Sequence, residues 1–382
     1  MNFPVPLPDR RKKNENSNIN LSNENNINDL KSSKKYSKEE NEIETTYVEK
    51  KTSFEQQNNN MAKIKLKHIE DIRQKILNFK LLSEKTMYLT PTSSSDYYIN
   101  KCNIILFGPS GSGKSSFIKS MYRSLYNTSI LPPDAINKLI IKNTYENEGT
   151  LYFNKLHLKE ENNNSSGIII CDTRGHIKMN DNEKEQFKIL LNGNVKDGIK
   201  IEQRKERDYL SLWEFWKKDS ELFPKEIFNA EQVGIDSIPH CIVFVFDGSS
   251  DEVIQKEDEN FYKELVNISK KKGYDNIHII LTRIDIFEKL INDRNKFLPF
   301  SERSSKVSNL KDEKIEKVIE VLGVNRSNIH FIENYHSDDI KENSYEIDYS
   351  LLKTMFDIIN SCELFIMYYI NKNESCFTSC FG

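Results

Sequence analysis

Apolar positions are scattered near the start of the chain and become regular from residue 61 onward. Residues 1–60 are rich in Asn, Lys, Glu and Ser, so they cannot bury enough apolar surface to offset chain entropy, and we expect disorder there. Apolar residues between 64 and 82 fall on one helical face, which predicts a leading helix. Residues 102–107 form a continuous apolar run before a glycine-rich turn, a pattern that indicates a buried first strand.

Strand-like and helical segments alternate after this point. Helices are expected between most strands, including 116–126 and 252–272, and a last helix is expected over about 350–371. This alternation predicts an α/β fold of three layers, with helices on both faces of a mostly parallel central sheet. The further strands are expected at 151–158, 167–171, 241–246, 277–281 and 329–332.

Length and charge limit the function classes. A chain of 382 residues fits one large α/β domain plus a tail better than two average domains. The formal net charge of -3 gives no overall basic field, so we expect no nucleic acid partner. The expected organisation is a disordered Asn-rich tail at 1–60, a leading helix and linker at 61–95, a domain at 96–372 with a helical insertion at about 177–237, and a flexible C-terminal tail at 373–382.

The lack of a recognisable targeting signal and the pattern of cysteines favour a cytoplasmic protein. Residues 1–30 lack an apolar core behind a basic start, and no run of eighteen apolar residues follows, so no transmembrane segment is expected. Six cysteines in a chain of this length do not form a disulfide framework. Cys376 and Cys380 leave lipidation open, although neither lies fourth from the end as prenylation requires.

Residues 108–115, with the sequence Gly-Pro-Ser-Gly-Ser-Gly-Lys-Ser, match the phosphate-binding loop of P-loop proteins and lie between a predicted strand and a predicted helix. In such a loop, backbone N–H groups and the positive end of the following helix face the phosphates. We expect Lys114 to reach the β- and γ-phosphates and the Ser115 hydroxyl to bind Mg²⁺. The residues assigned to the phosphates are Gly108, Ser110, Gly111, Ser112, Gly113, Lys114, Ser115 and Ser116.

A second motif follows the strand expected at 167–171. Asp172 is placed to hold Mg²⁺, and the N–H of Gly175 is placed to sense the γ-phosphate. The Asp-Glu pair with which a transporter ATPase would end this strand is absent. Thr150, in preference to Thr144, is the expected magnesium-contacting threonine, so the predicted metal ligands are Ser115, Thr150 and Asp172.

A third motif, Thr282-Arg283-Ile284-Asp285, resembles the Asn/Thr-Lys-x-Asp sequence that recognises guanine. Asp285 can accept two guanine protons, and the side chain of Arg283 can lie on the base. The alternative for Asp285 is a cap of the helix that follows. The order of the three motifs favours a P-loop G domain whose ligands are GTP or GDP with Mg²⁺. Asp247 is interpreted as a cap of the turn at 248–250.

Several segments together resemble the interferon-induced protein 44 family of GTPase-like proteins. The similarity covers about residues 65–370 and implies a large G domain implicated in GTP binding and in defence or stress responses. The TLD-type domain that some relatives carry upstream is absent. The segments that carry the resemblance are 107–117, 171–175, 191–197, 240–250, 281–285 and 334–335.

His176 directly follows the second motif, where Gln or His orients the attacking water in many GTPases, so it is the catalytic hypothesis; the alternative is a solvated loop residue. The predicted function is a magnesium-dependent GTPase that acts as a switch or in a defence response. A nucleotide-binding scaffold without hydrolysis and an ATP-using kinase or ATPase remain alternatives. The expected partners are a guanine nucleotide and an unidentified protein effector, and homo-oligomerisation is left open.

Overall fold

The computed structural model describes residues 60–82, 99–141, 152–162, 165–173, 175–176, 180–200, 225–228, 234–336 and 343–381. The chain divides into two units, Met1–Ile64 and Lys65–Gly382, and the fold below is that of the second unit. Apart from Asn60, the segment expected to be disordered (1–60) lies outside the described residues. The predicted metal ligand Thr150 also lies outside them, as do Trp213 and Trp216 in the expected insertion. The domain boundaries therefore stay predictions.

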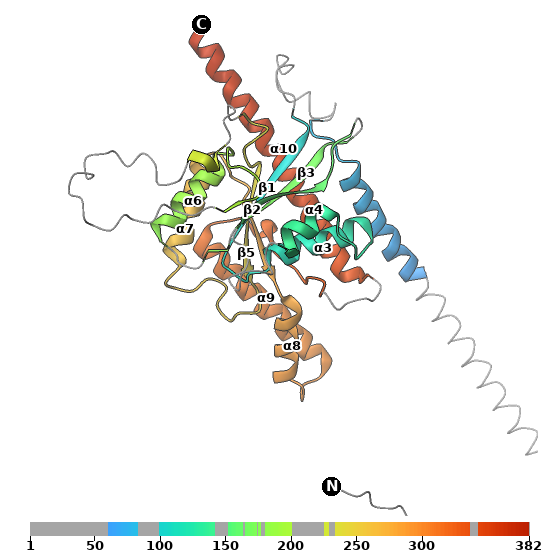
Figure 1. The fold of residues 1–382 in the computed structure, drawn as a ribbon. Coiled ribbons are helices and arrows are strands. Elements are labelled where there is room, and N and C mark those ends of the chain that lie inside the picture. Colours follow the sequence, from blue (N-terminus) through green and yellow to red (C-terminus); the bar gives the residue numbers. More distant parts are fainter. Residues whose placement is uncertain are drawn as a thin grey trace, which may run out of the picture. The chain divides into compact units, whose positions relative to one another are not determined.

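A seven-stranded sheet in the order β4-β2-β3-β1-β5-β6-β7 forms the centre of this unit (Figure 1). The five strands from β3 to β7 in this order pair in parallel, whereas β2 is antiparallel to both β3 and β4. The predicted fold class, a P-loop α/β fold with a mostly parallel sheet, is confirmed. The strands are β1 (Lys101–Phe107), β2 (Tyr152–Lys159), β3 (Gly167–Asp172), β4 (Ile199–Lys200), β5 (Cys241–Asp247), β6 (His278–Thr282) and β7 (Ile329–Phe331).

Helices cover both faces of the sheet, as the continuous burial of the central strands requires. Helices α3 and α10 pack against one face, and α6, α7 and α9 group together on the other (Figure 1). A helix over residues 60–77 precedes them, and Ile69, Ile72 and Ile76 of this helix are buried in the main core. The others are α3 (Lys114–Tyr126), α4 (Pro133–Ile136), α6 (Asp181–Leu191), α7 (Glu259–Lys271), α8 (Ile284–Arg294), α9 (Phe300–Leu322) and α10 (Tyr345–Phe381).

Two helix boundaries differ from the sequence prediction. The helix expected over 252–272 begins at Glu259, because Val253 and Ile254 pack against the core from an irregular segment instead of continuing the helical face. Helix α10 begins at Tyr345 and continues through residues that had been assigned to a flexible tail. Within the described residues, no helix is both long and apolar enough to cross a membrane.

The described part of the insertion at 177–237 is mixed rather than purely helical. It contains α6, the two-residue strand β4 and a short 3₁₀ helix at Lys225–Ile227. Helix α6 begins where the side chain of Asn180 accepts a hydrogen bond from the backbone N–H of Glu183, a standard N-cap arrangement. This helix packs beside α7 and so extends the helical layer on that face of the sheet.

Candidate nucleotide-binding site

The P-loop (residues 108–115) joins β1 to α3 at the carboxyl end of the sheet. A Cβ atom on Gly108 would lie 2.1 Å from the carbonyl oxygen of Val245 in β5, so only glycine fits there. Gly113 has φ 93° at the N-cap of α3, and no side chain caps this helix end. The N-terminus of α3, which carries the positive end of the helix dipole, therefore has no side-chain cap between it and an anion at this point.

Lys114 lies at the base of the P-loop. Its ammonium group donates hydrogen bonds of 2.9 Å to the carbonyl oxygens of both Gly108 and Pro109. Burial lowers the pKa of Lys114 to about 8, against the opposing effect of the nearby Asp172 carboxylate. The loop thus holds a largely desolvated cation beside the helix end, an arrangement suited to phosphate oxygens.

Asp172, at the end of β3, accepts a hydrogen bond of 2.6 Å from the hydroxyl of Ser115 through Oδ2. Its other oxygen, Oδ1, is buried and has no hydrogen-bond partner among the described residues. Burial raises the pKa of Asp172 to about 6, although Ser115, Lys114 and Lys119 act in the opposite direction. A buried carboxylate with one unpaired oxygen beside a hydroxyl is a fitting donor set for a hard cation such as Mg²⁺.

The predicted magnesium site would take few ligands from the protein. Among the described residues, no group of three or more His, Cys, Asp or Glu side chains is arranged to hold a metal ion. Magnesium commonly uses one or two protein ligands together with water and substrate phosphates, so Ser115 and Asp172 are sufficient for that kind of site. The third predicted ligand, Thr150, lies outside the described residues.

Gly175 and His176, which follow Asp172, pack directly on the P-loop. The backbone N–H of Ser110 donates to the carbonyl oxygen of His176 at 3.0 Å, and Pro109 and His176 form a β-bridge. A Cβ atom on Gly175 would lie 2.5 Å from the Cα atom of Ser110. The structure therefore brings the first two motifs into backbone contact, and a shift in either segment would move the other.

The imidazole of His176 does not line this site. Only 1% of the residue is exposed, and its Nε2 atom lies 2.6 Å from the hydroxyl oxygen of Tyr262 in α7. The ring stacks on Phe107 at a centroid distance of 4.8 Å. The expectation of a solvated loop residue is therefore wrong for this conformation, because the ring fills a space between β1 and α7. Its catalytic role stays a prediction.

The third motif (residues 282–285) follows strand β6 and contacts the P-loop. The Thr282 hydroxyl donates to the carbonyl oxygen of Ser112 at 2.8 Å. Arg283 adopts φ 59° and donates from Nη2 to the carbonyl oxygen of Gly111 at 2.9 Å, while its Nη1 pairs with Asp247. Thr282 thus clamps the loop, and Arg283 extends across it.

Two sequence interpretations of carboxylates can be compared with the structure. Asp247 accepts hydrogen bonds from the backbone N–H and the hydroxyl of Ser249, so its predicted turn-capping role is confirmed. The helix-capping alternative for Asp285 is wrong, because α8 begins with Arg283 as its N-cap. Asp285 lies in the first turn of α8, where its Oδ2 atom is 3.6 Å from Nε2 of His336.

These segments surround a cleft of about 450 Å³, called here the nucleotide cleft. The three sequence motifs do not include Asn334, Tyr335 and His336, although parallel strands bring the residues after β7 to the same sheet edge. Asp172 and Asp285 are adjacent to the lining rather than part of it. The lining residues are Ser110, Gly111, Gly113, Lys114, Ser115, Ser116, Gly175, Arg283, Asn334, Tyr335 and His336.

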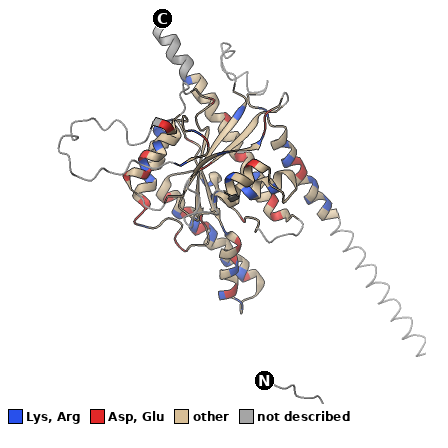
Figure 2. Ribbon diagram, in the orientation of Figure 1, with Lys and Arg blue, Asp and Glu red and all other residues tan. Residues whose placement is uncertain are grey.

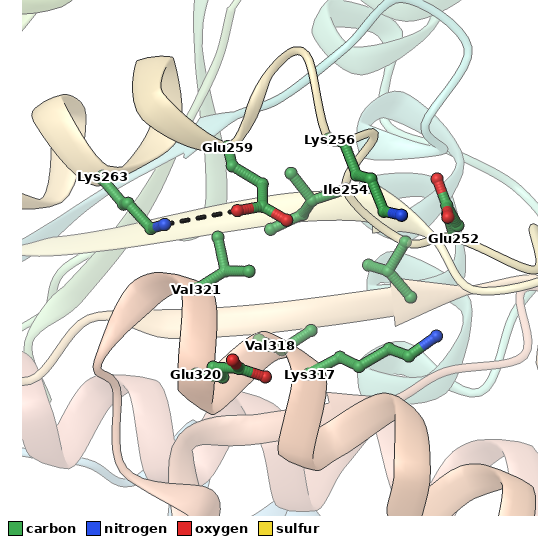
Figure 3. A pocket seen from close by; sticks show the side chains of 10 residues that line it. Glu252, Ile254, Lys256, Glu259, Lys263, Lys317, Val318, Glu320 and Val321 are labelled. Carbon is green, nitrogen blue, oxygen red and sulfur yellow. Dashed lines mark hydrogen bonds and ion pairs between the residues drawn. The ribbon is translucent and has the colours of Figure 1, made fainter.

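A separate hollow of about 230 Å³ lies between α9, α7 and the segment before α7 (Figure 3). Its apolar walls come from Val253, Ile254, Val318 and Val321. Its rim carries three lysines and three glutamates, of which Lys263 and Glu259 form an ion pair at 3.2 Å. The mixed rim favours neither anions nor cations, and none of the three motifs contributes to it.

No protein-family model matches the sequence, and no curated protein is significantly similar to it. Among solved structures, the chain is similar to Toc33 from Arabidopsis thaliana in complex with GDP and Mg²⁺, with 11% identity, a TM-score of 0.38, and coverage of 76% of this chain and 96% of that one. A dimerization-deficient Toc33 mutant gives 12% identity, a TM-score of 0.38, and coverage of 74% and 93%. Likeness at this level carries no inference about ligands.

Proposed function

We propose that this protein binds GTP and GDP with Mg²⁺ in the nucleotide cleft and acts as a nucleotide-dependent switch. The observation that carries the proposal is the convergence of three sequence motifs, far apart in the chain, on one edge of the sheet. The P-loop contacts Gly175 and His176 on one side and Thr282 and Arg283 on the other. Each motif supplies the chemistry that a different part of the ligand requires.

The phosphates would bind to the P-loop backbone, the open N-terminus of α3 and the Lys114 ammonium group. Ser115 and Asp172 would hold Mg²⁺, which supplies positive charge that neutralises the phosphate oxygens. The unpaired Oδ1 of Asp172 supports this assignment, because a buried carboxylate oxygen without a partner is unfavourable unless a ligand completes it.

The guanine base would lie beside Arg283, with Asp285 accepting hydrogen bonds from the N1–H and N2–H groups of the base. Arg283 is already directed over the P-loop by its bond to the Gly111 carbonyl, which supports a position next to the bound base. His336 lies close to Asp285 and is part of the cleft lining. Specificity for guanine over adenine would follow from the carboxylate, because the corresponding edge of adenine has no N–H donor at N1 or C2.

A substitution at Asp285 tests base recognition. Asp285→Asn should weaken GTP binding by roughly 10- to 100-fold, because one acceptor of a charge-assisted pair becomes a donor. ATP binding, where measurable, should not change. The exposed Asp275, which has no described partner, gives the matched control Asp275→Asn. Equal GTP affinity in the Asp285 variant and the wild type, measured by calorimetry, would refute the guanine assignment.

Hydrolysis of GTP is the finer part of the proposal, and the buried His176 favours a second candidate function, a switch that binds GTP without hydrolysing it. A catalytic His176 would have to leave its contacts with Tyr262 and Phe107. Single-turnover GTP hydrolysis by wild type and His176→Ala separates the two. Slower turnover at equal affinity supports catalysis by His176, whereas equal turnover assigns the ring to packing.

A role in defence or stress follows from the resemblance to the interferon-induced protein 44 family and is proposed on that basis alone. In this role the chain would be a cytoplasmic protein whose bound nucleotide changes between GTP and GDP with stress. Comparing the GTP-to-GDP ratio on the protein isolated before and after infection or stress tests this role. An unchanged ratio would contradict it.

A further inference from the structure

The hairpin formed by α8 and α9 has an apolar inner face that is already filled. Ile284, Phe287 and Ile291 of α8 form a small buried cluster, with Val307, Leu310 and Phe331 packed against it. This cluster closes the hairpin without using the aromatic residues at its tip. Figure 1 shows α8 and the start of α9 extending away from the sheet.

Two phenylalanines at the α8–α9 tip (residues 289–306) face solvent almost completely. Phe297 is 90% exposed and Phe300 is 78% exposed. Hydrogen bonds define the turn that presents them, including Leu298 N–H to the Asn295 carbonyl at 2.9 Å and the Asn295 side chain to the Ile291 carbonyl at 2.8 Å. Large exposed apolar groups on an ordered turn indicate a contact surface rather than incomplete packing.

The charge around these phenylalanines differs from that of the whole chain. The α8–α9 tip has five basic and two acidic residues, which gives a local charge of +3 in a chain of net charge -3. None of the five basic side chains forms an ion pair with a described carboxylate. Figure 2 shows basic positions on both helices of the hairpin. The five are Lys289, Arg294, Lys296, Arg303 and Lys306.

The basic groups are placed beside the aromatic rings. The ammonium group of Lys296 lies 5.2 Å from the ring centroid of Phe297, and the guanidinium group of Arg303 lies 6.0 Å from that of Phe300. Apolar side chains that enter the acyl boundary with cations at the headgroup level are typical of interfacial membrane contacts. Ile286 and Leu290, one turn apart on α8, are also 40% and 43% exposed.

We propose that the α8–α9 tip docks the protein on an anionic lipid surface, with Phe297 and Phe300 inserted into the interface and the basic residues bound to lipid headgroups. The unpaired positive charge favours an anionic bilayer over a purely apolar protein groove. The contact is peripheral and depends on both the phenylalanines and the charge, because neither two rings nor three net charges anchor a protein firmly alone. It is independent of the nucleotide assignment.

Vesicle flotation with the full chain tests the proposal. The wild-type chain should float with vesicles of phosphatidylcholine and phosphatidylserine and not with phosphatidylcholine alone. Raising the salt concentration from about 0.1 M to about 1 M, which shortens the Debye length from about 10 Å to about 3 Å, should release it. The double variant Phe297→Ser/Phe300→Ser should lose at least about tenfold in bound fraction. Lys296→Gln/Lys306→Gln should abolish the preference for phosphatidylserine.

Matched controls separate insertion from general effects. Ile130→Ser removes another apolar side chain, 77% exposed, outside the tip, and Lys67→Gln/Lys75→Gln removes two exposed charges on the helix over residues 60–77. Both controls should float like the wild type. Because Phe297 and Phe300 are exposed, their variants should retain the wild-type unfolding midpoint. A wild-type chain that binds no phosphatidylserine vesicle overturns the proposal, as does equal binding by the phenylalanine variant.

Discussion

Replacing Asp172 by Asn should stabilise the ligand-free protein while it weakens magnesium-dependent nucleotide binding. The buried carboxylate has its pKa raised from 3.8 to about 6 by burial. Asn has nearly the same shape and can still accept the Ser115 hydrogen bond, but it carries no charge. The substitution therefore removes the unfavourable buried charge and, with it, the proposed magnesium ligand.

The magnitude follows from the pKa shift. A carboxyl group whose folded pKa lies about two units above its unfolded value lowers the free energy of unfolding by about 3 kcal/mol once both states are ionised. In the folded state Asp172 stays protonated up to a higher pH than in the unfolded state, so the loss of stability develops as the pH rises from about 4 to about 6. The stability difference between Asp172→Asn and wild type should thus be near zero at pH 4 and about 3 kcal/mol at pH 7.5.

Urea unfolding at several pH values, without nucleotide, measures this difference. Asp275→Asn, which changes an exposed carboxylate, should stay within about 0.5 kcal/mol of wild type. Adding GTP and Mg²⁺ at 100 times the wild-type Kd should stabilise the wild type by about 2.7 kcal/mol and the Asp172 variant by much less. An Asp172 variant no more stable than the wild type at pH 7.5, or a stability difference independent of pH, would show that the Asp172 charge does not destabilise the ligand-free fold.

Three further outcomes are expected. Thr282→Val should lower the free energy of unfolding by about 1–3 kcal/mol and weaken GTP binding, because the Ser112 carbonyl loses a buried donor. Thr282→Ser keeps the hydroxyl and should retain wild-type stability in urea and wild-type GTP affinity in calorimetry. A Val variant equal to wild type in both measurements would contradict this role. Gly175→Ala should abolish GTP binding, since the added Cβ would lie 2.5 Å from the Ser110 Cα; wild-type affinity would contradict the packing of the two segments. Burial lowers the pKa of His240 to about 4, of His278 to about 3 and of His330 to about 4. As the pH drops below about 6.5, the unfolded chain therefore binds protons that the folded chain does not, and the free energy of unfolding should fall. Urea midpoints between pH 7 and pH 5 test this loss of stability, and they are measured in Asp172→Asn because the Asp172 carboxylate titrates in the same range with the opposite effect. A midpoint that stays constant over this range would exclude an effect of the buried histidines.

The sequence predicts the parts of this fold that depend on local patterns. Continuous apolar runs identified the central strands, since strands buried on both faces contain few polar residues. The positions of the P-loop, Asp172 and Thr282 at strand ends were enough to expect a common site, because parallel strands end at the same edge. The short edge strand β4 has only two residues and leaves no comparable pattern.

Side-chain directions that depend on distant residues were beyond local patterns. The imidazole of His176 lies in the core because it hydrogen-bonds to Tyr262 and stacks on Phe107, and Tyr262 is 86 residues away in the sequence. His336 lines the nucleotide cleft because β7 pairs beside β6, and the neighbouring segment 334–335 indicated a family resemblance but no position in the site. The roles of Thr282 and Arg283 in clamping the P-loop likewise became evident only from their contacts with Ser112 and Gly111.

Calorimetric titration of the full chain with GTP, GDP and ATP, each with Mg²⁺ and again with a chelator, tests the central claim most directly. GTP and GDP should bind, chelation should weaken GTP binding, and ATP should bind at least about 100-fold more weakly because Asp285 selects the guanine edge. Equal binding of ATP, or no binding of any of the three nucleotides, would contradict it.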